Sequence, residues 1–118
     1  LAKTEAEKQK KIAAAHHYYG RFDNIFLGPG LVDHGMITPM PSRTPKEELA
    51  ESLLIGSTQE VIDKLAPYAE LCLDRVSINP NCGLDAQDTM EALQAFAEDV
   101  IPHFTSTPVS SHKARKEA

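Results

Sequence analysis

The sequence predicts an α/β fold that is mostly helical with one or two short strands, on the basis of three observations. Residues 58–71 repeat apolar side chains at helical spacing. Residues 74–78 follow almost at once and alternate, with Val76 and Ile78 on one face, as in a half-buried strand. A second amphipathic helical pattern covers residues 86–104. A short strand between two helices is typical of βα-repeat proteins.

Residues 1–22 are predicted to form an N-terminal helix. Thr4 and Glu7 have the spacing of a capping box, in which a hydroxyl and a carboxylate satisfy backbone N–H groups at a helix start. Gly20 is expected to end or weaken this helix, because glycine is a poor helix former. His16 and His17 do not predict a metal site, since adjacent helix positions point about 100° apart. We expect one of them to be partly packed and the other solvated.

Residues 23–52 are predicted to form a long insertion-type loop. Residues 28–30 (Gly-Pro-Gly) break regular structure, and residues 33–35 (Asp-His-Gly) predict a turn. The segment is too apolar for a plain linker, so we expect it to pack on another part of the protein. Thr44 is expected to cap one or two helical turns that begin at Pro45.

Residues 53–104 are predicted to form a terminal helix–strand–helix unit. Ser57 and Glu60 make a second capping box; a helix start also suits an anion, but simple capping is favoured here. Asp85 is predicted to cap the last helix. The apolar stripe of that helix consists of Met90, Leu93, Phe96, Ala97, Val100, Ile101 and Phe104. Residues 105–118, rich in Ser, Thr, Pro and Lys, are expected to be a disordered tail.

A family resemblance appears in residues 56–83, GSTQEVIDKLAPYAELCLDRVSINPNCG. They look like the last helix, strand and loop of bacterial luciferase-like, flavin-dependent monooxygenases. The positions that fit the family pattern are Gly56, Ser57, Glu60, Val61, Leu65 and Asp74. Thr58 and Gln59 replace the usual Pro-Glu, and Cys72 stands where a glycine normally ends the helix. The resemblance covers about residues 22–104.

The resemblance implies a (β/α)8 TIM barrel that binds reduced FMN or, in some branches, the deazaflavin F420. A complete barrel needs about 250 residues, so 118 residues are expected to be a C-terminal fragment of one. Loops after barrel strands face the active site. The resemblance therefore implies that Ser77, Asn79 and Asn81 lie nearest the flavin or substrate. Turn formation is the competing role for the two asparagines. By the same resemblance, residues 23–45 would wall the active-site mouth, although a packed surface connection is an equal alternative.

Composition and charge restrict the classes of partner. The chain is 42% hydrophobic and 25% charged, with no apolar run of the ~20 residues that a membrane span needs. Net charge is −5; residues 1–11 and 105–118 each carry +2, and the residues between them carry −9. No aromatic residues interleave with the terminal lysines, so we expect no nucleic-acid partner. Two cysteines are too few for a disulfide framework, and we expect free thiols and a cytoplasmic location.

Three functional interpretations follow, and none assigns a catalytic residue, because the sequence offers no triad, no paired catalytic carboxylates and no metal-spaced cluster. The first is the C-terminal portion of a flavin-dependent monooxygenase or oxidoreductase that acts on a small organic substrate and is inactive as an isolated piece. The second is a non-catalytic helical interaction module that hides its apolar stripes by self-association. The third is a remnant without function. We expect the protein to be a homo-oligomer.

Overall fold

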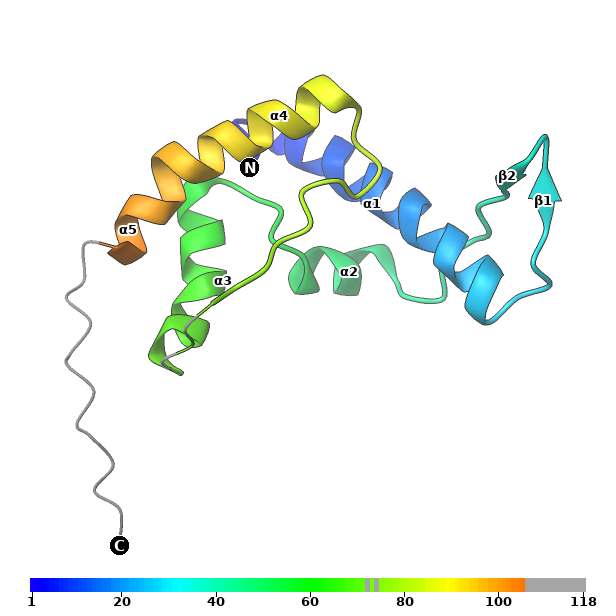
Figure 1. The fold of residues 1–118 in the computed structure, drawn as a ribbon, viewed down its shortest axis with the longest axis horizontal. Helices are drawn as coiled ribbons and strands as arrows, with labels where there is room; N and C mark the ends of the chain where they lie inside the picture. The colour runs from blue at the N-terminus through cyan, green and yellow to red at the C-terminus, as the bar shows by residue number, and fades with distance from the viewer. Residues whose placement is uncertain (72, 74, 106–118) are drawn as a thin grey trace, which may run out of the picture.

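The computed structural model of the chain describes residues 1–71, 73 and 75–105, and the architecture is mostly helical (Figure 1). The order of elements is α1, β1, β2, α2, α3, α4, the π-helical turn η1 and α5. The Cα radius of gyration is 17.8 Å, above the roughly 13–14 Å of a compact domain of this length. The elements are therefore spread out rather than wrapped around one central core. The predictions for Cys72, Asp74 and residues 106–118 lie outside the described residues.

Helix α1 spans Glu5–Phe26 and begins as predicted. The Thr4 hydroxyl accepts a hydrogen bond from the Glu7 N–H at 3.1 Å. The helix does not end at Gly20, contrary to expectation, because that glycine serves a close backbone contact instead of a helix end. The Met40 N–H donates to the Gly20 carbonyl at 3.1 Å, and a Cβ at position 20 would lie 2.1 Å from the Met40 carbonyl oxygen.

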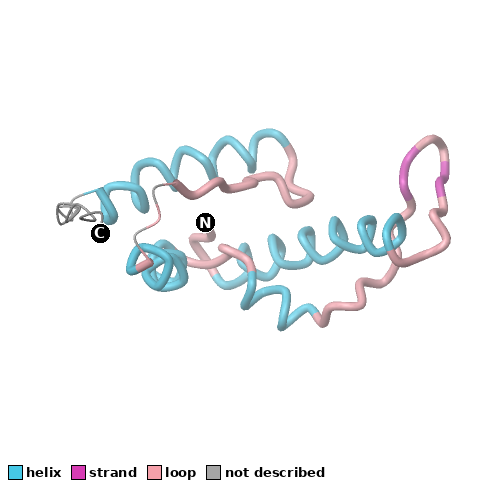
Figure 2. Tube along the Cα trace, turned by 60° about the horizontal axis from the view of Figure 1, so that its bottom comes forward, coloured by secondary structure: helices cyan, strands magenta, loops and turns pink. Residues whose placement is uncertain are grey.

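A β-hairpin follows α1 where an irregular loop was expected. Strands β1 (Val32–Asp33) and β2 (Met36–Ile37) pair antiparallel, with Val32 opposite Ile37 and Asp33 opposite Met36. The predicted turn is confirmed: His34 and Gly35 have φ values of 46° and 76°. Two successive residues with positive φ match the twist of a two-residue hairpin loop. Figure 2 shows the hairpin standing at one end of the molecule, beyond the end of α1.

Helices α2 (Lys46–Ser52) and α3 (Thr58–Glu70) continue the chain. Thr44 was predicted to cap α2, and this prediction is wrong. Pro45 is the N-cap and makes no side-chain capping bond. The capping box of α3 is confirmed in both halves. The Glu60 N–H donates to the Ser57 hydroxyl at 3.3 Å, and the Ser57 N–H donates to the Glu60 carboxylate at 2.7 Å.

The strand predicted over residues 74–78 is not seen. Residues 75–80 run as irregular chain, and so do residues 53–57. Within the described residues the hairpin provides the one β-ladder. A strand exists only by backbone pairing with a neighbour, and no described segment pairs with residues 75–80. The predicted strand count is thus right and its position wrong, and the described residues contain no parallel barrel strands.

The chain ends in one helical run made of α4 (Ala86–Ala95), η1 (Phe96–Val100) and α5 (Ile101–Thr105). The predicted cap is confirmed, because the Asp88 N–H donates to the Asp85 carboxylate at 2.8 Å. The wider π turn ends at Val100, two residues before Pro102 in α5. A proline inside a helix removes one backbone bond and crowds the turn before it, and π turns occur at such interruptions.

The apolar core lies where α3 and η1 meet. Val61 and Ile62 of α3 and Val100 of η1 are buried, and Phe96 and Phe104 pack partly buried against them. The predicted stripe of the last helix is therefore only partly covered in this structure. Met90 and Ile101, which belong to the same stripe, are 64% and 43% exposed.

Candidate ligand-binding cleft

A cleft of about 490 Å³ lies between α3, the α4–η1 run and the irregular segment that connects them. Its walls are mainly apolar and include Leu53, Leu65, Val76, Leu93 and Phe96. Segments far apart in the sequence meet here, because Tyr19 of α1 also lines the cleft. The volume is within the roughly 300–1,000 Å³ of ordinary small-molecule sites.

Two of the three predicted site residues line this cleft. Ser77 and Asn79 are among the lining residues, and Asn81 is not. All three side chains are exposed. The Asn81 N–H donates to the Asn79 side-chain oxygen at 3.2 Å, which is a local turn bond. That bond uses the side-chain oxygen of Asn79 and does not involve the side-chain NH₂ group.

Tyr19 is a cleft residue that sequence reasoning did not select. It is half-buried, and burial raises the pKa of its phenol above the ordinary value, with the neighbouring Cys82 thiol adding to the effect. The Cys82 thiol also contacts the Asn79 carbonyl oxygen at 3.8 Å. Tyr19 and Cys82 are 63 residues apart in the chain, so no local pattern could have indicated this contact.

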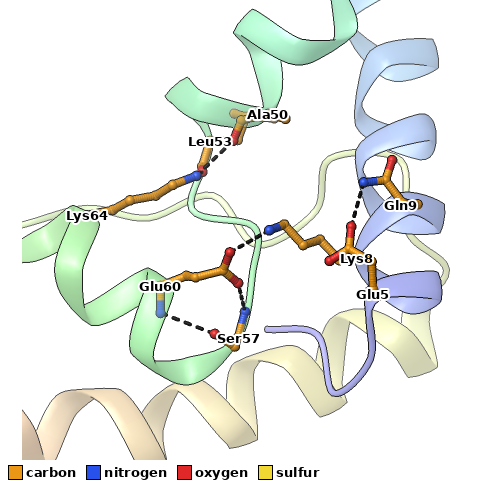
Figure 3. Close-up of polar contacts among 8 residues, drawn as sticks. All are labelled: Glu5, Lys8, Gln9, Ala50, Leu53, Ser57, Glu60 and Lys64. Atoms are coloured by element: carbon orange, nitrogen blue, oxygen red, sulfur yellow. Dashed lines mark hydrogen bonds and ion pairs between the residues drawn. The ribbon is translucent and has the colours of Figure 1, made fainter.

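Lys64 lines the cleft, and backbone carbonyl oxygens bind its ammonium group. Its Nζ donates to the carbonyl oxygens of Ala50 at 2.8 Å and Leu53 at 2.6 Å (Figure 3). These carbonyls belong to the end of α2 and the residue after it, where backbone acceptors lack helical partners. Burial lowers the pKa of Lys64 below its ordinary value. The second cleft lysine, Lys11, binds the Glu7 carboxylate at 2.6 Å.

A polar latch beside the cleft joins α1 to the start of α3 (Figure 3). The Lys8 ammonium contacts the Glu60 carboxylate at 2.5 Å, and that carboxylate also accepts the Ser57 N–H. The Lys8 ammonium and the Ser57 donors lower the pKa of Glu60 to about 2, and the same contact raises the pKa of Lys8. Because Glu60 occupies the free N–H of Ser57, simple capping accounts for this helix start.

The hairpin does not wall the cleft, since none of residues 23–45 lines it. This segment is instead organised by Asn24, a fully buried side chain that sequence reasoning missed. Its NH₂ group donates to the carbonyl oxygens of Leu31 at 2.8 Å and Thr38 at 2.7 Å, and its oxygen accepts the Leu31 N–H at 2.9 Å. The segment is therefore a surface connection, as one of the two alternatives predicted. Residues 25–37 are exposed, so this part does not pack on another part of the described chain as was expected.

Among the described residues, no three His, Cys, Asp or Glu side chains gather closely enough to hold a metal ion. His16 is partly packed and His17 exposed, which confirms the expectation that one of the two is packed and the other solvated. In the part of the chain that the structure describes, none of the helices has the length and apolar character needed to cross a membrane.

Comparison with known proteins gives a distant relationship. No protein-family model matches the chain, and no solved structure is significantly similar to it. Over 97% of its length the chain is 25% identical to the flavin-dependent trigonelline monooxygenase, oxygenase component, of Acinetobacter baylyi. The chain spans about a third of the length of that relative (34%). The chain is therefore similar, along nearly all of its own sequence, to part of a flavin-dependent monooxygenase.

Proposed function

We propose that this chain is the C-terminal portion of a luciferase-like, flavin-dependent monooxygenase with a TIM-barrel fold, which uses reduced flavin and O₂ to oxidise a small organic substrate. The observation that carries the proposal is the similarity over 97% of the chain to the oxygenase component of a flavin-dependent monooxygenase. The resemblance of residues 56–83 to the last helix–strand–loop of luciferase-like enzymes agrees with it. A cytoplasmic location is part of the same proposal.

The character of the cleft supports a site for a small organic molecule. Its walls are mainly apolar, with a few polar groups that include Ser77 and Asn79. Such a composition suits binding and orientation, since apolar walls supply contact area and a few polar groups fix the pose. A hydroxyl and an amide donate and accept hydrogen bonds but do not act as strong acids or bases. In this proposal a bound cofactor supplies the chemistry.

The donor set fits the ring system of a flavin better than its phosphate. Lys11 and Lys64 are the basic side chains that line the cleft among the described residues. Both ammonium groups are already engaged, with the Glu7 carboxylate and with two backbone carbonyls respectively. We therefore assign to this portion the contacts of Ser77 and Asn79 with the ring or the substrate, and we assign the phosphate to the rest of a longer enzyme.

When bound, the reduced flavin would supply the activation of oxygen, which no side chain of this cleft can supply. The contribution of this chain is to orient the bound ring through Ser77 and Asn79 and to keep water out with the apolar wall of Leu65, Leu93 and Phe96. FMN is the cofactor we propose; F420 is the alternative, and it would change the reaction to hydride transfer.

Anaerobic titration of the full natural enzyme with reduced FMN, and separately with reduced F420, tests the proposal. We expect saturable FMN binding and, after O₂ is admitted, oxygenation of the substrate. Asn79→Ala should weaken flavin or substrate binding by about three- to thirtyfold, the range for loss of one or two hydrogen bonds. Asn81→Ala, which changes an asparagine of the same loop outside the cleft, is the matched control.

Two outcomes would contradict the proposal. One is the absence of binding to either flavin by the full enzyme. The other is an equal effect of Asn79→Ala and Asn81→Ala, which would assign both asparagines to the turn alone. Saturable binding of F420 but not FMN would retain the site and change the cofactor. The isolated 118 residues are expected to be inactive.

The alternative function is a non-catalytic helical interaction module that self-associates. It is favoured by the large apolar side chains that remain exposed along the described chain, such as Phe26, Leu71 and Met90. This alternative predicts a defined oligomer and no flavin affinity in any form of the protein. The titration above and a measurement of oligomeric state together distinguish it from the monooxygenase.

A further inference from the structure

The loop of residues 79–83, which carries Asn79, lies directly on α1 (Figure 1). A Cβ at Gly83 would lie 2.7 Å from the Ala14 carbonyl oxygen and 3.1 Å from the Cβ of Tyr18. Gly83 also has a φ of 85°, a left-handed conformation that glycine adopts without strain. The loop therefore approaches α1 more closely than a residue with a side chain would allow at this position.

A second contact joins the same loop to Tyr19 of α1. Tyr19 and Cys82 both line the cleft, and both are half-buried. Burial raises the pKa of the Tyr19 phenol most, and the Cys82 thiol, which shares a hydrogen bond with the phenol, raises that pKa further. The thiol S–H donates to the Asn79 carbonyl oxygen at 3.8 Å. Because a thiol has one hydrogen, the Tyr19 hydroxyl is the donor to the sulfur, and the two bonds connect α1 to Asn79.

The Tyr19 ring is itself held in place by its neighbours on α1. It packs edge-on against the Tyr18 ring, with centroids 5.6 Å apart, and its centroid lies 5.9 Å from that of Phe22. An ion pair of 3.5 Å between Lys10 and Asp88 joins α1 to the first turn of α4, beyond the loop. The phenol therefore has a fixed position from which it can direct the loop.

Asn79 is the residue whose position depends on these contacts. Its side-chain oxygen accepts the Asn81 N–H at 3.2 Å, and its backbone carbonyl accepts the Cys82 thiol. The side-chain NH₂ is then the group that can donate to a molecule in the cleft, and the carbonyl oxygens of a flavin ring are acceptors for such a donor. A hydrogen bond weakens steeply when its donor is misaligned, so a shift of the loop would weaken this contact.

We propose that Tyr19 is a positioning residue that acts through Cys82 to hold the Asn79 loop on α1, and so aligns the Asn79 amide with a bound flavin ring. The inference rests on the proposed function, because it takes the flavin ring as the molecule that Asn79 contacts. Tyr19 itself need not touch the flavin. Its contribution is to fix the direction of the amide before the flavin binds, which lowers the entropy lost on binding.

Anaerobic titration of the full natural enzyme with reduced FMN, or with reduced F420 if the wild type binds that instead, tests this role. Tyr19→Phe removes the hydroxyl and retains the ring. It should raise the flavin dissociation constant about three- to tenfold, the range for loss of a hydrogen bond. Tyr18→Phe is the matched control, because Tyr18 is half-buried on the same helix and does not line the cleft. Cys82→Ser, which retains a donor and an acceptor, should weaken binding less than Cys82→Ala.

Gly83→Ala displaces the same loop while Tyr19 stays intact. The added Cβ would collide with the Ala14 carbonyl, so we expect flavin binding to weaken at least as much as in Tyr19→Phe. Gly35→Ala is the matched control, since Gly35 also has a positive φ, 76°, but a Cβ there meets nothing within 4 Å. It should change flavin binding by less than about twofold. Far-UV circular dichroism checks that each variant folds.

A double-mutant cycle separates positioning from direct contact. In an Asn79→Ala background Tyr19→Phe should have no further effect on flavin binding, because the residue through which it acts is gone. Additive effects of the two changes would overturn the proposal, since Tyr19 would then act on the flavin by another route. Equal effects of Tyr19→Phe and Tyr18→Phe would overturn it as well.

Alkylation of Cys82 by iodoacetamide gives a readout that needs no flavin. The rate is followed by mass spectrometry on the peptide that contains Cys82, at an alkaline pH where it no longer rises, so that exposure alone is compared. We expect roughly a threefold or greater increase in Tyr19→Phe and none in Tyr18→Phe, because thiol reactivity follows exposure. Equal rates in an enzyme that binds flavin would overturn the role of Tyr19 and leave the proposed function standing. If the wild type binds neither flavin, the proposed function fails, and a faster rate in Tyr19→Phe alone would still support the contact that holds the loop.

Discussion

The two ends of the molecule are stabilised by different kinds of interaction. At the α3–η1 end, Val61 and Val100 are almost fully buried in apolar contacts. At the hairpin end the fully buried side chain is Asn24, and its hydrogen bonds hold the loop while the surrounding apolar side chains stay exposed. The comparison teaches that a buried amide can fix a segment without an apolar core, while the apolar residues of that segment stay exposed.

The largest expected effect is at Asn24. Asn24→Ala removes three hydrogen bonds and leaves the carbonyl oxygens of Leu31 and Thr38 and the N–H of Leu31 without that partner. We expect a loss of about 2–4 kcal/mol in unfolding free energy, with hydrogen exchange of residues 30–38 accelerated most. Asn81→Ala, at an exposed asparagine, should cost less than about 0.5 kcal/mol. Equal effects of the two changes would mean that the hairpin does not depend on Asn24.

The next largest loss of stability is expected in the apolar core between α3 and η1. Val100→Ala opens a cavity beside Val61 and Ile62, and we expect a loss of about 1–3 kcal/mol. The hairpin amides should keep their relative protection, because the two ends share no core residues. Val76→Ala is the control, since Val76 is 56% exposed. Chemical denaturation with both variants measures the difference, and a Val100→Ala effect no larger than that of Val76→Ala would contradict the assignment of this core.

The smallest effect concerns the latch between α1 and α3, and it depends on pH. The pKa of Glu60 is lowered from 4.5 to about 2, so its carboxylate stabilises the folded state above pH 4.5 and this contribution is lost as the pH falls toward 2. Lys8 has a raised pKa, so its contribution is lost only at strongly alkaline pH. The Lys8 and Glu60 side chains are 22% and 45% exposed, so solvent and salt partly screen the pair and keep the effect modest.

Unfolding free energies of the wild type and Glu60→Gln between pH 7 and pH 3 measure this dependence. The difference between the two proteins should shrink as pH falls. Glu48→Gln, at an exposed position of α2, controls for the change in net charge. A difference that stays constant with pH would show that Glu60 acts by hydrogen bonding alone and not through its charge.

The sequence predicted the features whose cause is local. Ser57 with Glu60 and Asp85 with Asp88 are three residues apart, so each cap could be identified from spacing alone, and each is confirmed. The turn at His34 and Gly35 was likewise local. Gly20 was misjudged, because its role depends on a close approach by Met40, twenty residues away.

The cleft was predictable only in part. The family resemblance selected Ser77 and Asn79, which line it, but did not select Tyr19 or Lys64, which line it too. These two come from helices whose position relative to the loop depends on packing. In residues 75–80 the sequence predicted a strand that the structure does not have. Alternating apolar residues indicate a strand, but a strand forms only when a neighbouring strand pairs with its backbone.

The sequence by itself therefore determined where α1, α3 and α4 begin, that the chain is mostly helical, and which residues carry the apolar stripes. Capping and helical periodicity depend on neighbours within four positions, and those neighbours are fixed by the order of residues. The tertiary structure decided which stripe is buried, that Asn24 organises the hairpin, and that the cleft draws on α1 as well as α3. These depend on contacts between distant segments, and their free energies arise only when packing brings those segments together.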